Sequence, residues 1–109
     1  MPGVGTNKVF ENDRVIVWEM ALEPGESTGV HRHQHEYFFQ VISGSTLETI
    51  STDGTSLGAF EFETGSTHYL TLEGDQLVYG EVRVPAEHEA RNVGDSRYFE
   101  ILVELKPGA

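Results

Sequence analysis

Three of the five histidines in this chain occur at alternate positions in the segment HRHQHE, at residues 31–36. Alternate residues of a β-strand share one face, so we expect His31, His33, His35 and Tyr37 to line up together. Two imidazoles at this spacing can bind one metal ion, with each nitrogen about 2.0–2.2 Å from the ion. The segment therefore predicts a metal site built on a strand, completed by a ligand from elsewhere in the chain.

A polar strand face is the alternative interpretation of this segment, because single histidines are more often surface or hydrogen-bonded residues than ligands. Three histidines this close together, after a turn and before the apolar run YFFQVI, favour the metal site. A pair of ligands suffices here, so His35 is expected to face solvent where the strand begins. The remaining histidines, His68 and His88, are the histidine candidates for a third ligand.

The composition excludes several other kinds of chemistry. The chain has no cysteine, which rules out disulfides, iron–sulfur clusters, thiolate zinc sites and a cysteine nucleophile. It also lacks a G-x-S-x-G nucleophile elbow, a phosphate-binding loop and a dinucleotide-binding fingerprint. A metal must then be bound by histidine, carboxylate, tyrosine or water.

The charge of the chain argues against nucleic acids and membranes as partners. Eighteen acidic and seven basic residues give a formal net charge of −11, and the basic residues do not cluster. Binding to nucleic acid or to an anionic membrane depends on neutralising phosphates with basic side chains.

No apolar window of about 18 residues is present, and the start MPGVGTNK does not resemble a secretory signal. We therefore expect a soluble cytoplasmic protein with a small-molecule partner.

The elements that must position these residues are strands. Apolar runs such as RVIVWEMAL, YFFQVI, SLGAFEF, QLVYGEVRV and RYFEILVEL are separated by turn signals such as EPGE, STDGT, ETGS and NVGDS. No window has the sustained spacing of an amphipathic helix. About seven to nine short strands predict an all-β sandwich or barrel. We expect a single domain over residues 1–109.

The histidine segment resembles the first motif of the cupin superfamily, G-x5-H-x-H-x3–4-E-x6-G. Gly25 is followed by five residues and then by His31 and His33, and Gly44 closes the motif. Tyr37 stands where the family has its carboxylate. The run EPGESTGVHRHQHEYFFQVISG is also similar to small cupins of β-alanine catabolism, which have tyrosine there. The resemblance supports a fold and a site more than a particular reaction.

The segment VPAEHEARN resembles the second cupin motif, G-x5-P-x-G-x2-H-x3-N. His88 and Asn92 keep the H-x3-N spacing, but Pro85 lies only three residues before His88 and the intervening glycine is absent. The resemblance covers about residues 15–105, with residues 1–12 as an N-terminal extension. It implies a small RmlC-like cupin, a single-domain double-stranded β-helix or jelly-roll barrel.

The two motifs together imply that His31, His33 and His88 bind a divalent transition metal, which is Fe, Mn, Ni or Zn. The spacing does not choose among these metals, because their sites overlap in imidazole geometry. Without the carboxylate, neutral imidazoles leave the ion its full charge and more open positions for water or substrate. Such a site suits an anionic chelating ligand.

Other polar residues are candidates around the metal. Tyr37 is expected either at the fourth corner of the site, as a hydrogen-bond donor or acid–base group, or in the core. If the strand contains a bulge, His35 or Glu36 takes the place of the missing carboxylate. Arg83 is our candidate for pairing with a substrate carboxylate, because GEVRV is a predicted strand leading into the second motif. His68 is interpreted as a surface residue, with a place in the site as the alternative if its strand lines the mouth of the barrel.

These residues predict a metal-dependent enzyme acting on a small oxygenated, anionic metabolite, by dioxygenase, isomerase or decarboxylase/lyase chemistry. The alternative is a non-catalytic cupin that binds or senses a small ligand, which predicts tight binding without turnover. A structural interaction domain is the third possibility and predicts no bound metal. The terminal run YFEILVEL has apolar residues on both faces, so we also expect a homodimer.

Overall fold

The computed structural model describes residues 3–107, which contain eleven strands and no helix. None of these residues therefore forms a helix that could cross a membrane. The strands are β1 (Asn7–Glu11), β2 (Val15–Leu22), β3 (His31–Arg32), β4 (Glu36–Ser43), β5 (Ser45–Ile50), β6 (Ser56–Phe62), β7 (Thr67–Glu73), β8 (Gln76–Tyr79), β9 (Val82–Pro85), β10 (Glu87–Asn92) and β11 (Tyr98–Leu105). All their pairings are antiparallel, and the predicted all-β class is confirmed.

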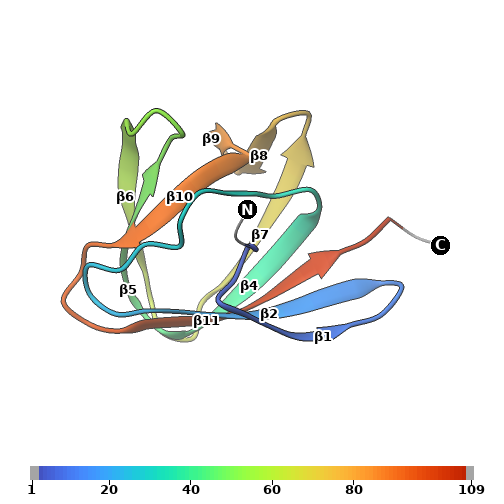
Figure 1. Cartoon of the computed structure of the whole chain (residues 1–109), viewed down its shortest axis with the longest axis horizontal. Coiled ribbons are helices and arrows are strands. Elements are labelled where there is room, and N and C mark those ends of the chain that lie inside the picture. Colours follow the sequence, from blue (N-terminus) through green and yellow to red (C-terminus); the bar gives the residue numbers. More distant parts are fainter. Residues whose placement is uncertain (1–2, 108–109) are drawn as a thin grey trace.

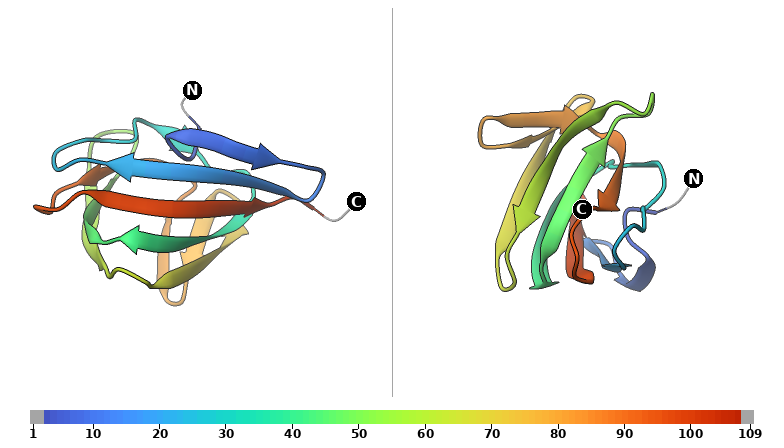
Figure 2. Two further views of the ribbon diagram at one scale, coloured as in Figure 1. Left: turned by 90° about the horizontal axis from the view of Figure 1, so that it is seen from below. Right: turned by 90° about the vertical axis from the view of Figure 1, so that its left-hand side faces the viewer.

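The strands form two sheets with the interior between them. One sheet has the order β1-β2-β11-β4-β7-β8-β9, and the other has the order β3-β10-β5-β6. Figure 1 shows β5 and β6 on one side of the interior and β4 and β7 on the other. In Figure 2 (left), β1, β2, β11 and β4 lie side by side and form one wall. In the smaller sheet, β3 pairs with β10 so that His31 lies opposite His88. This pairing joins the two sequence motifs.

The alternation of side chains along each strand sets what faces the interior. β11 has every second residue buried, namely Tyr98, Glu100, Leu102 and Glu104. Glu100 lies opposite Met20 on β2 and Val41 on β4, both buried apolar residues. Two carboxylates therefore point inward from a strand whose other inward residues are large and mostly apolar.

The chain passes from the larger to the smaller sheet at Gly44, between β4 and β5. A Cβ atom at this position would collide with backbone atoms of Phe62 and Thr64. The Gly44 nitrogen also donates a hydrogen bond to the Thr64 hydroxyl at 2.9 Å. Only glycine fits this close approach without a shift of the backbone, which explains the residue that ends the first motif.

The histidine segment is not one strand, so the prediction that His31, His33, His35 and Tyr37 share a strand is wrong. His31 belongs to β3 in the smaller sheet, whereas Tyr37 belongs to β4 in the larger one. Residues 33–35 cross between the sheets, and the backbone nitrogen of His33 donates a hydrogen bond to the Ala86 carbonyl at 2.9 Å. Because the chain crosses here, side chains from both sheets lie close together in the interior.

The run QLVYGEVRV, predicted as a strand, is a hairpin of β8 and β9. Tyr79 pairs with Val82, which leaves a two-residue loop at Gly80 and Glu81. Gly80 has a φ of 61°, as the first position of a type II′ hairpin turn requires. The hairpin places residues of both its strands against the interior.

Candidate metal site

The structure brings His31, His33 and His88 together inside the barrel, although they come from β3, the crossing segment and β10. Their side chains are 3%, 3% and 7% exposed. One ring nitrogen from each lies within 4.8 Å of the others, and the Nε2 atoms of His31 and His33 are 3.2 Å apart. Two nitrogens bound to one ion are about 2.8–3.4 Å apart at angles of about 90–109°. The three histidines are therefore positioned to bind a metal ion.

Backbone carbonyls fix the orientation of two of the three rings. The Nδ1 atom of His31 lies 3.0 Å from the Gly29 carbonyl, and that of His88 lies 2.7 Å from the Pro85 carbonyl. A carbonyl only accepts, so each Nδ1 carries the proton and each Nε2 keeps its lone pair. This is the usual arrangement of a histidine ligand whose second nitrogen is anchored by the protein. Pro85, in the shortened turn before His88, thus supplies the carbonyl that orients the His88 ring.

Burial keeps these histidines neutral at pH 7. Desolvation lowers the pKa of His31 to about 4, and the neighbouring His88 adds to the effect. The pKa of His33 is lowered well below its usual value by burial and by the two other histidines, and burial also lowers the pKa of His88. Neutral imidazoles are the form that binds metal ions.

Within the described range 3–107, the protein leaves one buried ring nitrogen of His33 without a partner. Its Nδ1 atom has no hydrogen-bond partner among the described residues, and its ring stacks on Tyr37 with the centroids 4.4 Å apart. Buried polar atoms without a partner cost free energy and are uncommon outside functional sites. Three imidazole nitrogens also suit Zn, Fe, Ni or Mn, so the residues present fit a divalent transition metal.

Asn92, the last residue of the second motif, fixes the end of β10 through hydrogen bonds. It is fully buried, and its amide donates to the carbonyls of Leu22 and Ser96 at 2.9 and 2.8 Å. Its carbonyl accepts from the Ser45 hydroxyl at 2.8 Å and from the Gly94 nitrogen at 3.0 Å. These four bonds tie the end of β10 to β2, to β5 and to the turn that contains Gly94 and Ser96, so Asn92 positions the strand that carries His88.

The structure places Tyr37 in the pocket, where it lines the cavity beside His33. Burial, with Glu100 and Glu104 nearby, raises the pKa of its phenol far above the usual value. The hydroxyl therefore stays protonated at neutral pH and can donate a hydrogen bond.

Neither residue proposed to replace the missing carboxylate reaches the three histidines. The Nδ1 atom of His35 lies 3.1 Å from a carboxylate oxygen of Glu104, and the ring is half-buried rather than exposed to solvent. Glu36 is exposed and accepts a hydrogen bond from Tyr69 at 2.9 Å. The crossing at residues 33–35 turns both side chains away from the cavity.

Arg83 is not brought to the site. Its side chain is 51% exposed and pairs with Glu73 on the outside of the barrel, at 3.3 Å. Its neighbours Val82 and Val84 line the cavity instead. Strand alternation thus gives Arg83 the opposite orientation to the one a substrate-binding residue needs.

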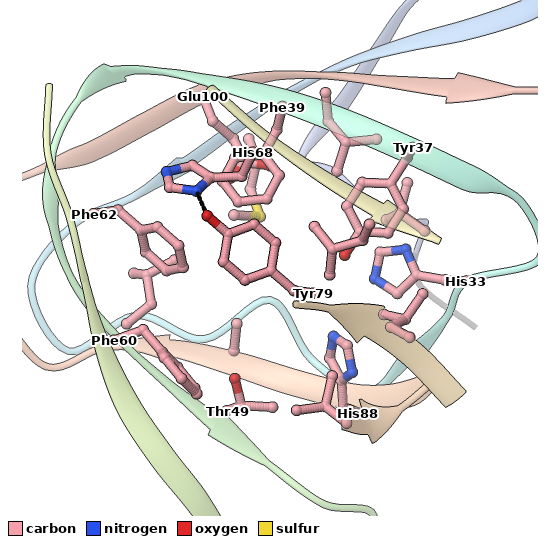
Figure 3. Close-up of a pocket in the computed structure, with 18 of the residues that line it drawn as sticks. His33, Tyr37, Phe39, Thr49, Phe60, Phe62, His68, Tyr79, His88 and Glu100 are labelled. Atoms are coloured by element: carbon pink, nitrogen blue, oxygen red, sulfur yellow. Dashed lines mark hydrogen bonds between the residues drawn. The ribbon is translucent and has the colours of Figure 1, made fainter. Parts of the chain in front are cut away.

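The histidines open into a cavity of about 140 Å³ between the two sheets. Figure 3 shows His33 and His88 at one end, Phe60 and Phe62 at the other, and Tyr79 between them. His68 also lines this cavity, contrary to the prediction of a surface residue. Its two ring nitrogens lie 2.8 Å from the Tyr79 hydroxyl and 2.9 Å from the Ser66 hydroxyl.

Sequence reasoning missed Glu100, which lines the cavity from β11. Its side chain is 3% exposed and accepts a hydrogen bond from the buried Tyr98 hydroxyl at 2.5 Å. Desolvation raises the pKa of Glu100 to about 7, although the Tyr98 bond works against the shift. The available signal was its position, because Glu100 alternates in phase with Tyr98 and Leu102 on the buried face of the strand.

The comparisons with known proteins find similarity in structure. No family model and no curated protein matches the chain. A cupin domain from Bordetella pertussis has a TM-score of 0.66 and 22% identity, over 94% of this chain and 97% of that chain. An RmlC-like cupin with a double-stranded β-helix fold from Methanocaldococcus jannaschii has a TM-score of 0.60 and 14% identity, over 92% and 77%. An oxalate decarboxylase structure has a TM-score of 0.55 and 18% identity, over 86% and 22%.

Proposed function

Because this chain has the double-stranded β-helix fold of the cupin superfamily, we propose that it is a metal-dependent enzyme acting on a small oxygenated, anionic metabolite. The observation that supports this proposal is the convergence of three neutral, buried histidines on one end of an internal cavity. The fold alone does not choose a reaction, because one fold hosts many activities. Dioxygenase, isomerase and decarboxylase/lyase reactions all fit such a site.

His31, His33 and His88 would hold the ion, and the chain supplies no carboxylate from the second motif or the crossing segment. A divalent ion in such a site acts as a Lewis acid toward a carbonyl, enolate or carboxylate, or activates dioxygen if it is iron. The three imidazoles are neutral, so they leave the charge of the ion available to compensate an anionic substrate group.

Two further residues would handle protons in the cavity. Tyr37 keeps its proton and would donate a hydrogen bond to a substrate oxygen held beside His33. Glu100 lines the same cavity, and burial raises its pKa to about 7, so it can hold or release a proton near neutral pH. These two roles are the acid–base part of the proposal.

Turnover by the metal-loaded protein tests the proposal. A screen of oxygenated acids should give a reaction that is lost in His33→Ala, and Tyr37→Phe should reduce its rate without changing the metal content. Tight ligand binding by the metal-loaded protein with no turnover of any candidate would instead favour the non-catalytic binding protein.

We also propose that the chain forms a homodimer through the outer face of the larger sheet. Phe10, Val17, Val103, Phe38 and Tyr69 form one row across β1, β2, β11, β4 and β7. Phe10 is 53% exposed and Tyr69 is 46% exposed. Contiguous exposed apolar surface is typical of protein interfaces.

Sedimentation equilibrium tests this assembly. Wild type should sediment as a dimer, and Val103→Glu should dissociate it, because a charge would be buried at the centre of the row. Val93→Glu, at an exposed apolar residue outside the strands, is the matched control and should remain dimeric. A wild-type monomer at every concentration would disprove the proposed interface.

A further inference from the structure

The cavity beyond the three histidines has apolar walls. Phe39 and Phe62 meet edge to face with their ring centroids 5.6 Å apart, and Phe60 lies 6.5 Å from Phe62. Leu47 and Leu70 line the cavity from opposite sheets. Aromatic rings favour such offset and edge-to-face neighbours, so these walls suit a flat apolar group.

The cavity offers no positive charge away from the histidine end. None of the seven basic residues lines it, and all seven lie within the described range 3–107. Arg32 and Arg83, for example, pair with Asp75 and Glu73 on the outside. The one acidic residue in the lining is Glu100. A second anionic group of a ligand would be buried there without a partner, which is costly.

The His68 ring at the far end already has partners within the protein. Both ring nitrogens of His68 are engaged, one by Tyr79 and the other by Ser66. The His68 ring therefore does not need a polar ligand group as a partner. The unpartnered buried nitrogen in the cavity region belongs to His33, at the metal end.

The size of the cavity limits what enters it. Its volume is about 140 Å³, and an apolar cavity of about 150 Å³ binds one benzene molecule. One six-membered ring therefore fills the space between the sheets. A longer ligand would have to extend into solvent.

We propose that the ligand of this site combines metal-chelating oxygen atoms at one end with an uncharged apolar body of about one ring. The inference rests on the proposed metal site, because the chelating end would bind there. It narrows the substrate class, since small aliphatic diacids would bury a second carboxylate against Glu100 and the phenylalanine walls. The single anionic group of the substrate would be the one held by the ion.

Hydroxamates test this inference, because the chelating group stays the same while the body changes. Isothermal titration of the zinc-loaded protein would compare acetohydroxamate, benzohydroxamate and the monohydroxamate of succinic acid. Benzohydroxamate should bind at least about tenfold more tightly than acetohydroxamate, because it buries a phenyl ring. The succinate compound should bind at least about tenfold more weakly than benzohydroxamate, because its body carries a charge.

A cavity-filling variant tests whether the phenyl ring of benzohydroxamate binds in this cavity. Thr49 lines the cavity from β5, so Thr49→Phe should remove the advantage of benzohydroxamate while the protein still binds zinc. Thr52→Phe makes the same change at an exposed turn residue and should behave like wild type. The comparison of the three hydroxamates on wild type stands even if Thr49→Phe does not fold.

The outcomes separate this inference from the proposed function. Equal affinities for acetohydroxamate and benzohydroxamate, or tighter binding of the succinate compound, would overturn the inference while leaving the metal site intact. Failure of the protein to retain any of zinc, iron, manganese and nickel would overturn the metal site itself, and the inference with it.

Discussion

The Nε2 atoms of His31 and His33 lie 3.2 Å apart in the interior, although one histidine belongs to β3 and the other to the crossing between the sheets. The Gly29 carbonyl holds the proton of His31 on Nδ1, so the His31 Nε2 atom presents a lone pair to His33. Without an ion, His33 must donate its proton to that lone pair. A metal ion between the rings would accept a lone pair from each Nε2, with the His33 proton on Nδ1 instead, which is why metal binding is the central claim.

Metal binding should stabilise the fold. We expect zinc to raise the free energy of unfolding by about 4 kcal/mol at a free concentration about 1,000 times the dissociation constant. Urea denaturation at pH 7.5, with zinc or with a chelator, measures this difference. His88→Ala should lose the gain and His35→Ala should keep it, because His35 pairs with Glu104 instead. An equal gain in His88→Ala would show that zinc binds elsewhere.

Glu100 should make the metal-free protein less stable as the pH rises. Its carboxyl holds a proton up to about pH 7 when folded, but only up to 4.5 when unfolded. The unfolded state therefore releases its proton first, and the folded state loses stability between pH 4.5 and about 7. A difference of this size corresponds to about 3 kcal/mol.

The variant Glu100→Gln isolates this effect. It should match wild type within about 1 kcal/mol at pH 5 and exceed it by about 3 kcal/mol at pH 8, because the amide never ionises. Urea denaturation at both pH values gives the two differences. A gap between the two proteins that does not change with pH would mean that Glu100 is ionised throughout.

Asn92 should be among the most sensitive polar positions. Asn92→Ala removes four hydrogen bonds and leaves the Leu22 carbonyl and the Gly94 nitrogen without this partner. We expect a loss of about 3 kcal/mol, since each buried unsatisfied group costs about 1–3 kcal/mol. Asn12→Ala, at an exposed turn, should cost only about 1 kcal/mol. Similar losses at the two positions would argue against the anchoring role of Asn92.

Arg83→Ala should have little effect. Exposed ion pairs such as that of Arg83 with Glu73 contribute about 0–1 kcal/mol, so stability should change by no more than this. Metal content and benzohydroxamate affinity should stay within about twofold of wild type, since the side chain does not line the cavity. A tenfold loss of affinity would mean that Arg83 reaches the ligand after all.

The sequence predicted the fold class well because turn chemistry and alternation are local signals. SLGAFEF coincides with β6, and RYFEILVEL differs from β11 by one residue. The hairpin of β8 and β9 was missed although Gly80 supplies its turn, because the apolar alternation continues on both sides of that glycine. A period of two does not show where a strand reverses direction.

The site residues were predictable only where the chain keeps the spacing of the two cupin motifs. His31, His33 and His88 converge as the two motifs implied. Glu100 was missed because the sequence of its strand gives no sign of what the side chain faces across the barrel. The orientation of Arg83 depended on the register of a hairpin that the sequence did not reveal.

Elemental analysis is the most direct test of the metal site. Purified protein would be loaded with zinc, iron, manganese or nickel, desalted and analysed as wild type, His33→Ala, His88→Ala and the control His35→Ala. We expect about one ion per chain in wild type and in the control, and less than about a tenth of that in the other two variants. A wild-type protein that retains no metal, or His33→Ala and His88→Ala proteins that retain as much as wild type, would contradict the assignment.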